Sequence, residues 1–221
     1  KAYLSGADLS SGHLTEAVLS MADLSDATLI SANLSQASLR HAFLNGADLT
    51  EANLESADLA SADLTDAVLK NANLNNISLN GSVLKGSDLD GAVLVNAILV
   101  NAILSGATLI KSQLTGANLT NANLSGATLQ KANLRGTILR GADLSRVNLA
   151  NADMTGAILR KAILAGADLT DAKLVDVDWR GADLSDVDLS TSRVTKADVA
   201  HSILCGTRMP WGEENGGCEK Q

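Results

Sequence analysis

A leucine recurs every five residues along almost the whole chain, and this period constrains the fold more than any other feature. It runs from Leu4 to Leu204 without an insertion or deletion, and 37 of the 41 central positions are leucine. The position two residues earlier is alanine in 30 of the 41 units, and the residue between them is most often Asp or Asn. The repeating unit is therefore A-(D/N)-L-x-x.

A period of five fits neither an α-helix nor one continuous β-strand. A helix would spread the leucines around its surface, and a strand would alternate them between two faces. Within each unit the small residue and the leucine share one side, which is typical of a short strand. The last two residues are rich in Ser, Thr, Gly, Asn and Asp, which favour turns. We therefore expect a solenoid lined with Leu and Ala.

Residues 91–110 form a run of twenty residues without a charge, about the length of a transmembrane helix. Leu94, Leu99, Leu104 and Leu109 keep the five-residue register through this run, whereas a helix would interrupt the period on both sides. We therefore interpret the run as four repeat units and expect no membrane insertion.

The outward positions of this run are apolar, although they are polar in most other units. They define what we call the central girdle: Val93, Val95, Ile98, Val100, Ile103 and Ile110. Two interpretations stay open. The residues can reflect the ordinary preference of β-branched side chains for strands, or they can form a contact surface for a partner or a second rod.

The repeat units, such as GADLS at 6–10 and GANLT at 116–120, resemble the pentapeptide-repeat family over residues 1–205. This resemblance implies an all-β fold, a right-handed quadrilateral parallel β-helix with four units in each of about ten coils. At a coil spacing of about 4.8 Å, the rod would be about 50 Å long. We therefore divide the chain into a β-helix at 1–205 and a C-terminal cap and tail at 206–221.

The C-terminal end departs from the repeat in composition. The register continues to Met209, and Pro210, which lacks a backbone donor, is expected to stop the coil. Trp179 occupies an inward leucine position, and we expect it to repack the last coils. Met209 and Trp211 are the residues that we expect to cover the open end.

Cys205 and Cys218 bracket this end, in a segment similar to the C-terminal closure of exported family members. The resemblance implies a disulfide, worth about 3 kcal/mol in the chain-entropy model; two free thiols are the alternative. A disulfide would place the protein in the periplasm, the cell exterior or the thylakoid lumen, and free thiols would indicate the cytoplasm. The chain begins at Lys1 within the pattern and without a signal segment, so we expect a trimmed product of a longer chain.

Charge is distributed unevenly over the expected rod. With four units per coil, two adjacent sides carry fifteen acidic and five basic residues, and the other two carry seven acidic and ten basic residues. Arg140, Arg160 and Arg180 would stack in successive coils, and we call them the arginine stripe. A net charge of −8 argues against nucleic acid as a partner. A solvated surface is the ordinary explanation of such charges, and recognition by a protein partner is the alternative.

Candidate groups for catalysis are sparse and scattered. His13, His41 and His201 fall at outward positions of distant coils, so they cannot form a catalytic triad or a metal site together. The two cysteines would need further nearby ligands to bind a metal ion. A convex rod also lacks the concave site that catalysis needs. We therefore expect no enzymatic activity, no cofactor and no metal.

The sequence favours a non-catalytic protein–protein interaction module or structural scaffold. Its protein partner is unidentified, and association through the girdle or through an uncapped end is expected. The alternative is a DNA mimic that binds and protects type II topoisomerase (DNA gyrase), as some acidic members of the family do. The acidic sides and the rod length favour this alternative. The uninterrupted register, the absence of acidic residues from 91 to 142 and the lack of an apolar C-terminal helix disfavour it.

Overall fold

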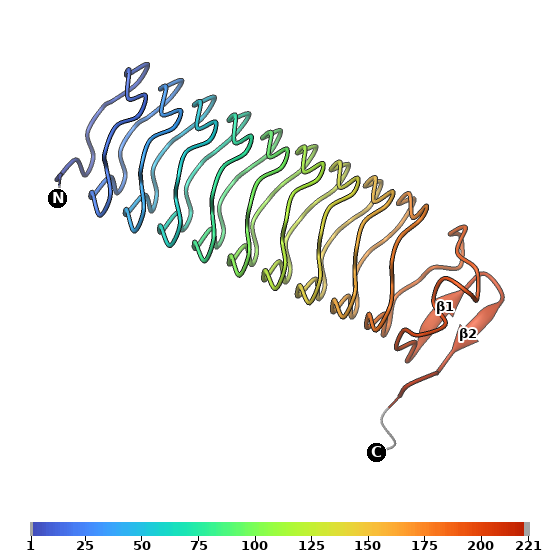
Figure 1. Ribbon diagram of the computed structural model, residues 1–221. Coiled ribbons are helices and arrows are strands. Elements are labelled where there is room, and N and C mark those ends of the chain that lie inside the picture. The colour runs from blue at the N-terminus through green and yellow to red at the C-terminus, as the bar shows by residue number, and fades with distance from the viewer. Residues whose placement is uncertain (1, 219–221) are drawn as a thin grey trace.

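The computed structural model describes residues 2–218, which form a stack of four-sided coils followed by a small β-hairpin (Figure 1). Parallel bridges join the middle residue of each side to the residue twenty positions later, from Tyr3 with Asp23 to Ile163 with Asp183. Four pentapeptides therefore complete one turn. The predicted right-handed parallel β-helix is confirmed, and the number of ten coils stays a prediction.

Each side of a coil bonds to the coils on both sides of it through its backbone. The N–H of a central leucine donates to a carbonyl in the following coil, as Leu49 does to Val68 at 2.7 Å. The N–H of the middle residue donates to the preceding coil, as Asp48 does to Ala27 at 2.9 Å. From Tyr3 to Asp183 the stack is thus a continuous ladder of parallel strand pairs.

The corners depend on a residue in the left-handed backbone region. The N–H of each inward small residue donates to the leucine carbonyl three residues earlier, as Ala52 does to Leu49 at 3.0 Å. The residue just before it has positive φ, from 54° at Ser31 to 70° at Gly91. Because Gly and Asn tolerate this conformation best, it explains their frequency at these corners.

The outward Asp or Asn closes the same corner with its side chain. Asp153 accepts hydrogen bonds from the Thr155 N–H at 3.1 Å and the Thr155 hydroxyl at 2.6 Å. The pairing of Asp or Asn with Ser or Thr two residues later is therefore a turn-closing device. Asn73 donates to Asn53 at 3.0 Å and Asn53 to Asn33 at 3.3 Å, so these amides also form a ladder along the rod.

The core is a narrow column of leucines and small residues, and its interior coils are buried from Ala22 to Leu169. Some inward positions carry a buried hydroxyl instead of alanine, and each donates to a leucine carbonyl. Ser82 Oγ, for example, lies 2.7 Å from the Leu79 oxygen. Within residues 2–218, no buried side-chain nitrogen or oxygen lacks a hydrogen-bond partner.

The ladder is interrupted near the C-terminal end, before the boundary at 205 that we expected for the β-helix. In the described chain, residues 168, 173 and 178 have no bridges to residues 188, 193 and 198, and bridging resumes with Asp183 and Ile203. The Gly181 N–H donates to the His201 carbonyl, whereas the regular pattern would use the carbonyl of residue 200. The backbone register is therefore shifted by one residue at this point. Residues 191–200 leave the stack, as the last part of the coil in Figure 1 shows.

Trp179 gives a physical reason for this displacement. Its side chain is 1% exposed at a position where other coils hold leucine, so the next coil must accommodate a larger group. Val194 and Val199 of the displaced segment are still buried, at 7% and 2% exposure. The segment therefore keeps its inward residues while it loses its backbone pairing.

The chain ends in an antiparallel hairpin of β1 (Thr207–Met209) and β2 (Gly212–Glu214). Pro210 and Trp211 form the turn between the strands, where proline is favoured because its φ is fixed. Met209 is 2% exposed, and Trp211 packs half-buried against the core with its Nε1 2.7 Å from Glu214 Oε1. The sequence predicted a stop at Pro210 but not the hairpin.

The predicted disulfide is present and joins Cys205 to Cys218, with 4.9 Å between their Cα atoms. It lies beside a hydrogen bond from the Leu204 N–H to the Gly216 carbonyl at 2.7 Å. The bridge and this bond fasten the end of the hairpin segment to the last part of the coil.

Candidate interaction surfaces

Among residues 2–218, no three His, Cys, Asp or Glu side chains converge to hold a metal ion. His13, His41 and His201 are exposed and belong to different coils. The described part of the chain also has no helix of the length and hydropathy that a membrane crossing requires.

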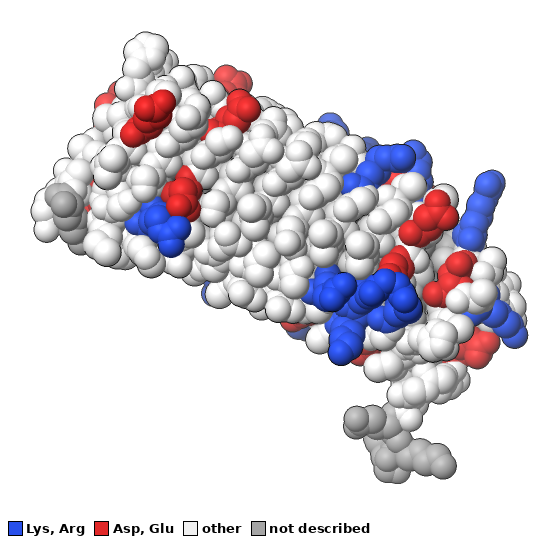
Figure 2. Space-filling model, in the orientation of Figure 1, with Lys and Arg blue, Asp and Glu red and all other residues white. Residues whose placement is uncertain are grey.

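The central girdle forms one apolar turn of the rod. Ile98 is 41% exposed and Ile103 40% exposed, whereas Val93, Val95, Val100 and Ile110 are half-buried. On the face drawn in Figure 2, charged side chains gather toward the two ends, and a broad uncharged band lies between them. On this face, the middle of the rod is therefore a broad zone without charged side chains.

The preceding coil supplies the turn-closing acceptors that the girdle lacks. Val93 and Thr108 replace the usual Asp or Asn, so the turn amides two residues later need another partner. The Val95 N–H donates to Asn75 Oδ1 at 3.1 Å, and the Ile110 N–H donates to Asp90 Oδ1 at 2.8 Å. Asn75 and Asp90 therefore support the girdle, a role that the repeat pattern alone does not reveal.

The arginine stripe lines a shallow cavity of about 330 Å³ together with Lys161. Arg160 and Arg180 both pair with Asp178, and the Arg180 Nη2 lies 2.7 Å from its Oδ2. Arg140 forms no ion pair with a described residue. One carboxylate therefore pairs with two of the four cations, and the cavity keeps an excess of positive charge.

Other ion pairs connect neighbouring coils and lower the pKa of their acids. Partial burial raises the pKa of Asp153, but hydrogen bonds from Thr155 and Arg135 and the charge of Lys173 outweigh it, so the pKa lies below its ordinary 3.8. Asp88 behaves in the same way: burial raises its pKa, and hydrogen bonds from Lys70 and other donors outweigh this rise, so the pKa is lowered overall. These acids are therefore charged near neutral pH.

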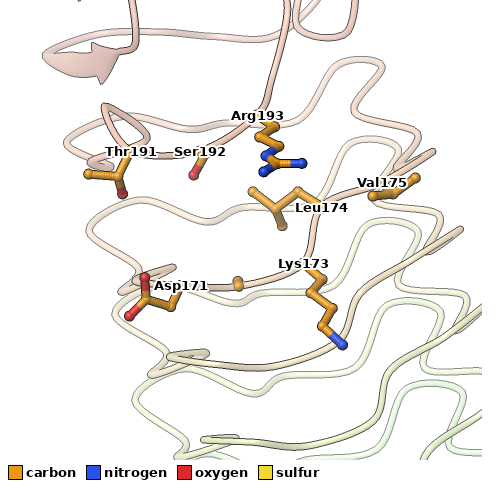
Figure 3. A pocket seen from close by; sticks show the side chains of 8 residues that line it. Asp171, Lys173, Leu174, Val175, Thr191, Ser192 and Arg193 are labelled. Atoms are coloured by element: carbon orange, nitrogen blue, oxygen red, sulfur yellow. The ribbon is translucent and has the colours of Figure 1, made fainter.

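The interruption of the ladder opens a cleft between two coils, which we call the parted coil. It has a volume of about 320 Å³ and is lined by residues 171–175 and 191–193. In Figure 3, Leu174 points into this space beneath Ser192 and Arg193. The sequence analysis did not find this cleft, and its signal was the replacement of central leucines by Trp179, Val194 and Val199.

The fold defines the class of this protein as a solenoid built from five-residue units. The family model of pentapeptide repeats matches successive segments from 2–40 to 162–199, with eight copies. The chain therefore belongs to the pentapeptide-repeat family, whose members are generally structural or interaction modules.

Several solved structures are similar to this chain. HetL, a pentapeptide repeat protein involved in heterocyst differentiation regulation in the cyanobacterium Nostoc, is 39% identical over 82% of this chain and 84% of its own, with a TM-score of 0.48. A pentapeptide repeat protein of the Arabidopsis thaliana thylakoid lumen is 31% identical over 49% of this chain and 68% of its own, with a TM-score of 0.35. QnrB1, a plasmid-mediated fluoroquinolone resistance protein, is 18% identical over 74% of this chain and 84% of its own, with a TM-score of 0.47. No curated protein sequence matches the chain.

Proposed function

We propose that the protein is a non-catalytic interaction module, a rod that binds a protein partner through its central girdle. The exposure of Ile98 and Ile103 in a turn without charge carries this proposal. Single exposed apolar residues are ordinary, but here Val95, Ile98 and Val100 follow one another on the outside of a single coil. Contiguous apolar surface of this kind is typical of protein contacts.

The arginine stripe continues the corner column of this surface, with Thr120 between Val100 and Arg140, and it constrains the partner. Val100 stands at the same corner column as Arg140, Arg160 and Arg180. An apolar contact with a cationic border fits a partner whose apolar patch has an acidic rim. The rim would set orientation and association rate, and the apolar centre would supply most of the affinity.

Affinity capture from the cells that make the protein tests the girdle. The test variant combines Val95→Ser, Ile98→Ser and Val100→Ser. The control variant combines Val18→Ser, Met21→Ser and Ile30→Ser near the N-terminal end of the rod. We expect the partner to be captured by the native protein and the control but not by the test variant. Equal capture by all three proteins would reject the girdle as the interface.

A supercoiling assay separates this proposal from mimicry of DNA. We expect neither protection nor inhibition of type II topoisomerase, because residues 91–142 carry no acidic side chain and a DNA mimic needs continuous negative charge. Inhibition at micromolar concentration, retained by the girdle variant, would overturn our proposal and favour the mimic.

We also infer that the protein works in an oxidising compartment, on the basis of the bridge between Cys205 and Cys218. Mass spectrometry after thiol alkylation, on protein taken from its native cells, provides the test. Two alkylated cysteines in unreduced protein would contradict the inference.

A further inference from the structure

The two walls of the parted coil are chain edges with unpaired backbone groups: Lys173 still bridges to Asp153, and Arg193 belongs to no bridge in the described chain. On one wall, the Leu174 N–H and the Ala172 carbonyl have no hydrogen bond within the described chain, although the equivalent groups of regular coils bond to the next coil. On the other wall, the Arg193 N–H and carbonyl also lack a described partner. Such edges are templates for the addition of a strand.

The cleft between these edges has the size and the lining of a binding site. Its volume of about 320 Å³ falls within the range of small ligand pockets, about 300 to 1,000 Å³. Leu174 and Ala172 are only half-buried there, whereas the inward residues of the regular coils are buried. An occupant that covers both would complete the core as well as the ladder.

Charge at the outer rim selects the kind of occupant. Lys173 and Arg193 stand at the same outward column, one on each wall of the cleft. Lys173 is 71% exposed and its Nζ lies 3.5 Å from Asp153 of the preceding coil, whereas Arg193 forms no ion pair with a described residue. Asp171, also in the lining, supplies one negative charge against these two cations, so the excess charge at the cleft is positive and a carboxylate fits best.

We propose that the parted coil binds an extended peptide with the pattern small residue, acidic residue, leucine, as an added parallel strand. The acidic residue would face Lys173 and Arg193, and its neighbours would face Ala172 and Leu174. The peptide backbone would accept from the N–H groups of Leu174 and Arg193 and donate to the carbonyls of Ala172 and Arg193. This mode is strand addition, in which the backbone supplies affinity and alternate side chains supply specificity.

Fluorescence anisotropy with labelled heptapeptides tests this proposal independently of the girdle, which lies on other coils. The probe is Ser-Gly-Ala-Asp-Leu-Ser-Gly, and two control peptides carry Lys in place of Asp or an N-methyl group on the Asp nitrogen. We expect the full chain to bind the probe, the lysine peptide to bind about tenfold more weakly or worse, and N-methylation to remove binding.

Two protein variants test the site itself. Lys173→Glu with Arg193→Glu should reverse the preference, so that the lysine peptide binds better than the probe. Lys111→Glu with Lys131→Glu is the matched control, because it changes the net charge equally at exposed positions of other coils. This control should bind the probe as the native chain does.

Hydrogen exchange gives a readout at the backbone. Saturating probe should slow the exchange of the Leu174 and Arg193 amides, whereas the amides of the regular coils should not change. Equal binding of the probe and the lysine peptide, unchanged binding after N-methylation, or unchanged exchange at both amides would each overturn the proposal.

Discussion

Substitution of Asp153 separates its role in the turn from its role in ion pairs. Its side chain is 21% exposed and accepts two hydrogen bonds from Thr155, while Arg135 and Lys173 lie 3.3 and 3.5 Å away. Asp153→Asn keeps an acceptor for the turn and removes the charge. Asp153→Ala removes both.

The expected cost of each change follows from these contacts. Loss of a side-chain acceptor for a turn amide resembles loss of a helix N-cap, which costs about 0.5 to 2 kcal/mol. The two cations are 54% and 71% exposed, so each ion pair contributes at most about 1 kcal/mol. We therefore expect Asp153→Asn to lower the free energy of unfolding by at most about 2 kcal/mol, and Asp153→Ala to lower it by about 1 kcal/mol more.

Urea denaturation followed by circular dichroism measures both values. Glu55→Gln and Glu55→Ala are the matched controls, since the Glu55 side chain is exposed and accepts no hydrogen bond from a described residue. These two should differ by only a few tenths of a kcal/mol. If Asp153→Asn and Asp153→Ala unfold with equal free energies, the turn-closing role that we assign to Asp153 is wrong.

The same series gives a pH dependence with a defined sign. The pKa of Asp153 is lower in the folded protein than its ordinary 3.8, so its charge stabilises the fold fully above that value. This contribution is lost as the pH falls from 3.8 through the folded pKa. The difference between the native protein and Asp153→Asn should therefore shrink below pH 3.8, and a difference that does not change with pH would contradict the assignment.

Two further predictions concern the core and the cap. Leu99→Ala should lower the free energy of unfolding by about 2 to 5 kcal/mol, because it leaves a cavity at a fully buried position. Leu174→Ala should cost clearly less in the same urea titration, because Leu174 is half-buried, and equal costs would refute this reasoning. Replacement of Cys205 and Cys218 by serine should cost about 3 kcal/mol and speed hydrogen exchange from Ile203 to Gly216, while exchange around Leu99 should stay unchanged.

Most of the fold could be predicted because one five-residue unit sets both the core and the corners. The leucine and the small residue determine what is buried, and the Asp or Asn with the following Ser or Thr determines how each corner closes. The family resemblance supplied the number of sides, which the bridge between Tyr3 and Asp23 shows directly. Periodicity alone cannot give this number, because three-sided and four-sided coils bury the same residues.

The parted coil could not be predicted, because its sequence keeps the five-residue spacing even where Trp179, Val194 and Val199 replace leucine. Val194 and Val199 fall at central positions and are buried as the repeat requires, yet their backbones leave the ladder. Backbone pairing depends on the distance between neighbouring coils along the rod axis. The repeat pattern of the sequence does not determine this distance. The hairpin was missed for a different reason: strands of three residues are too short to show an alternating pattern.

The partners of charged side chains also lay beyond the sequence. Stacking predicted the arginine stripe, but not that Arg160 and Arg180 would share Asp178 while Arg140 pairs with no described residue. Such choices depend on side-chain rotamers at the corners. The acceptors Asn75 and Asp90 were missed for a similar reason, since each acts on a coil other than its own.

The four-sided coil has a consequence for insertions and deletions. Adding five residues between the girdle and Arg140 would leave every leucine inward, yet it would rotate all later residues by a quarter turn around the axis. Val100 would then stand at a different corner from the arginine stripe, although the core would be unchanged. Adding twenty residues would lengthen the rod and restore the alignment. Packing tolerates any multiple of five, so only a partner that touches two coils at once can select for multiples of twenty.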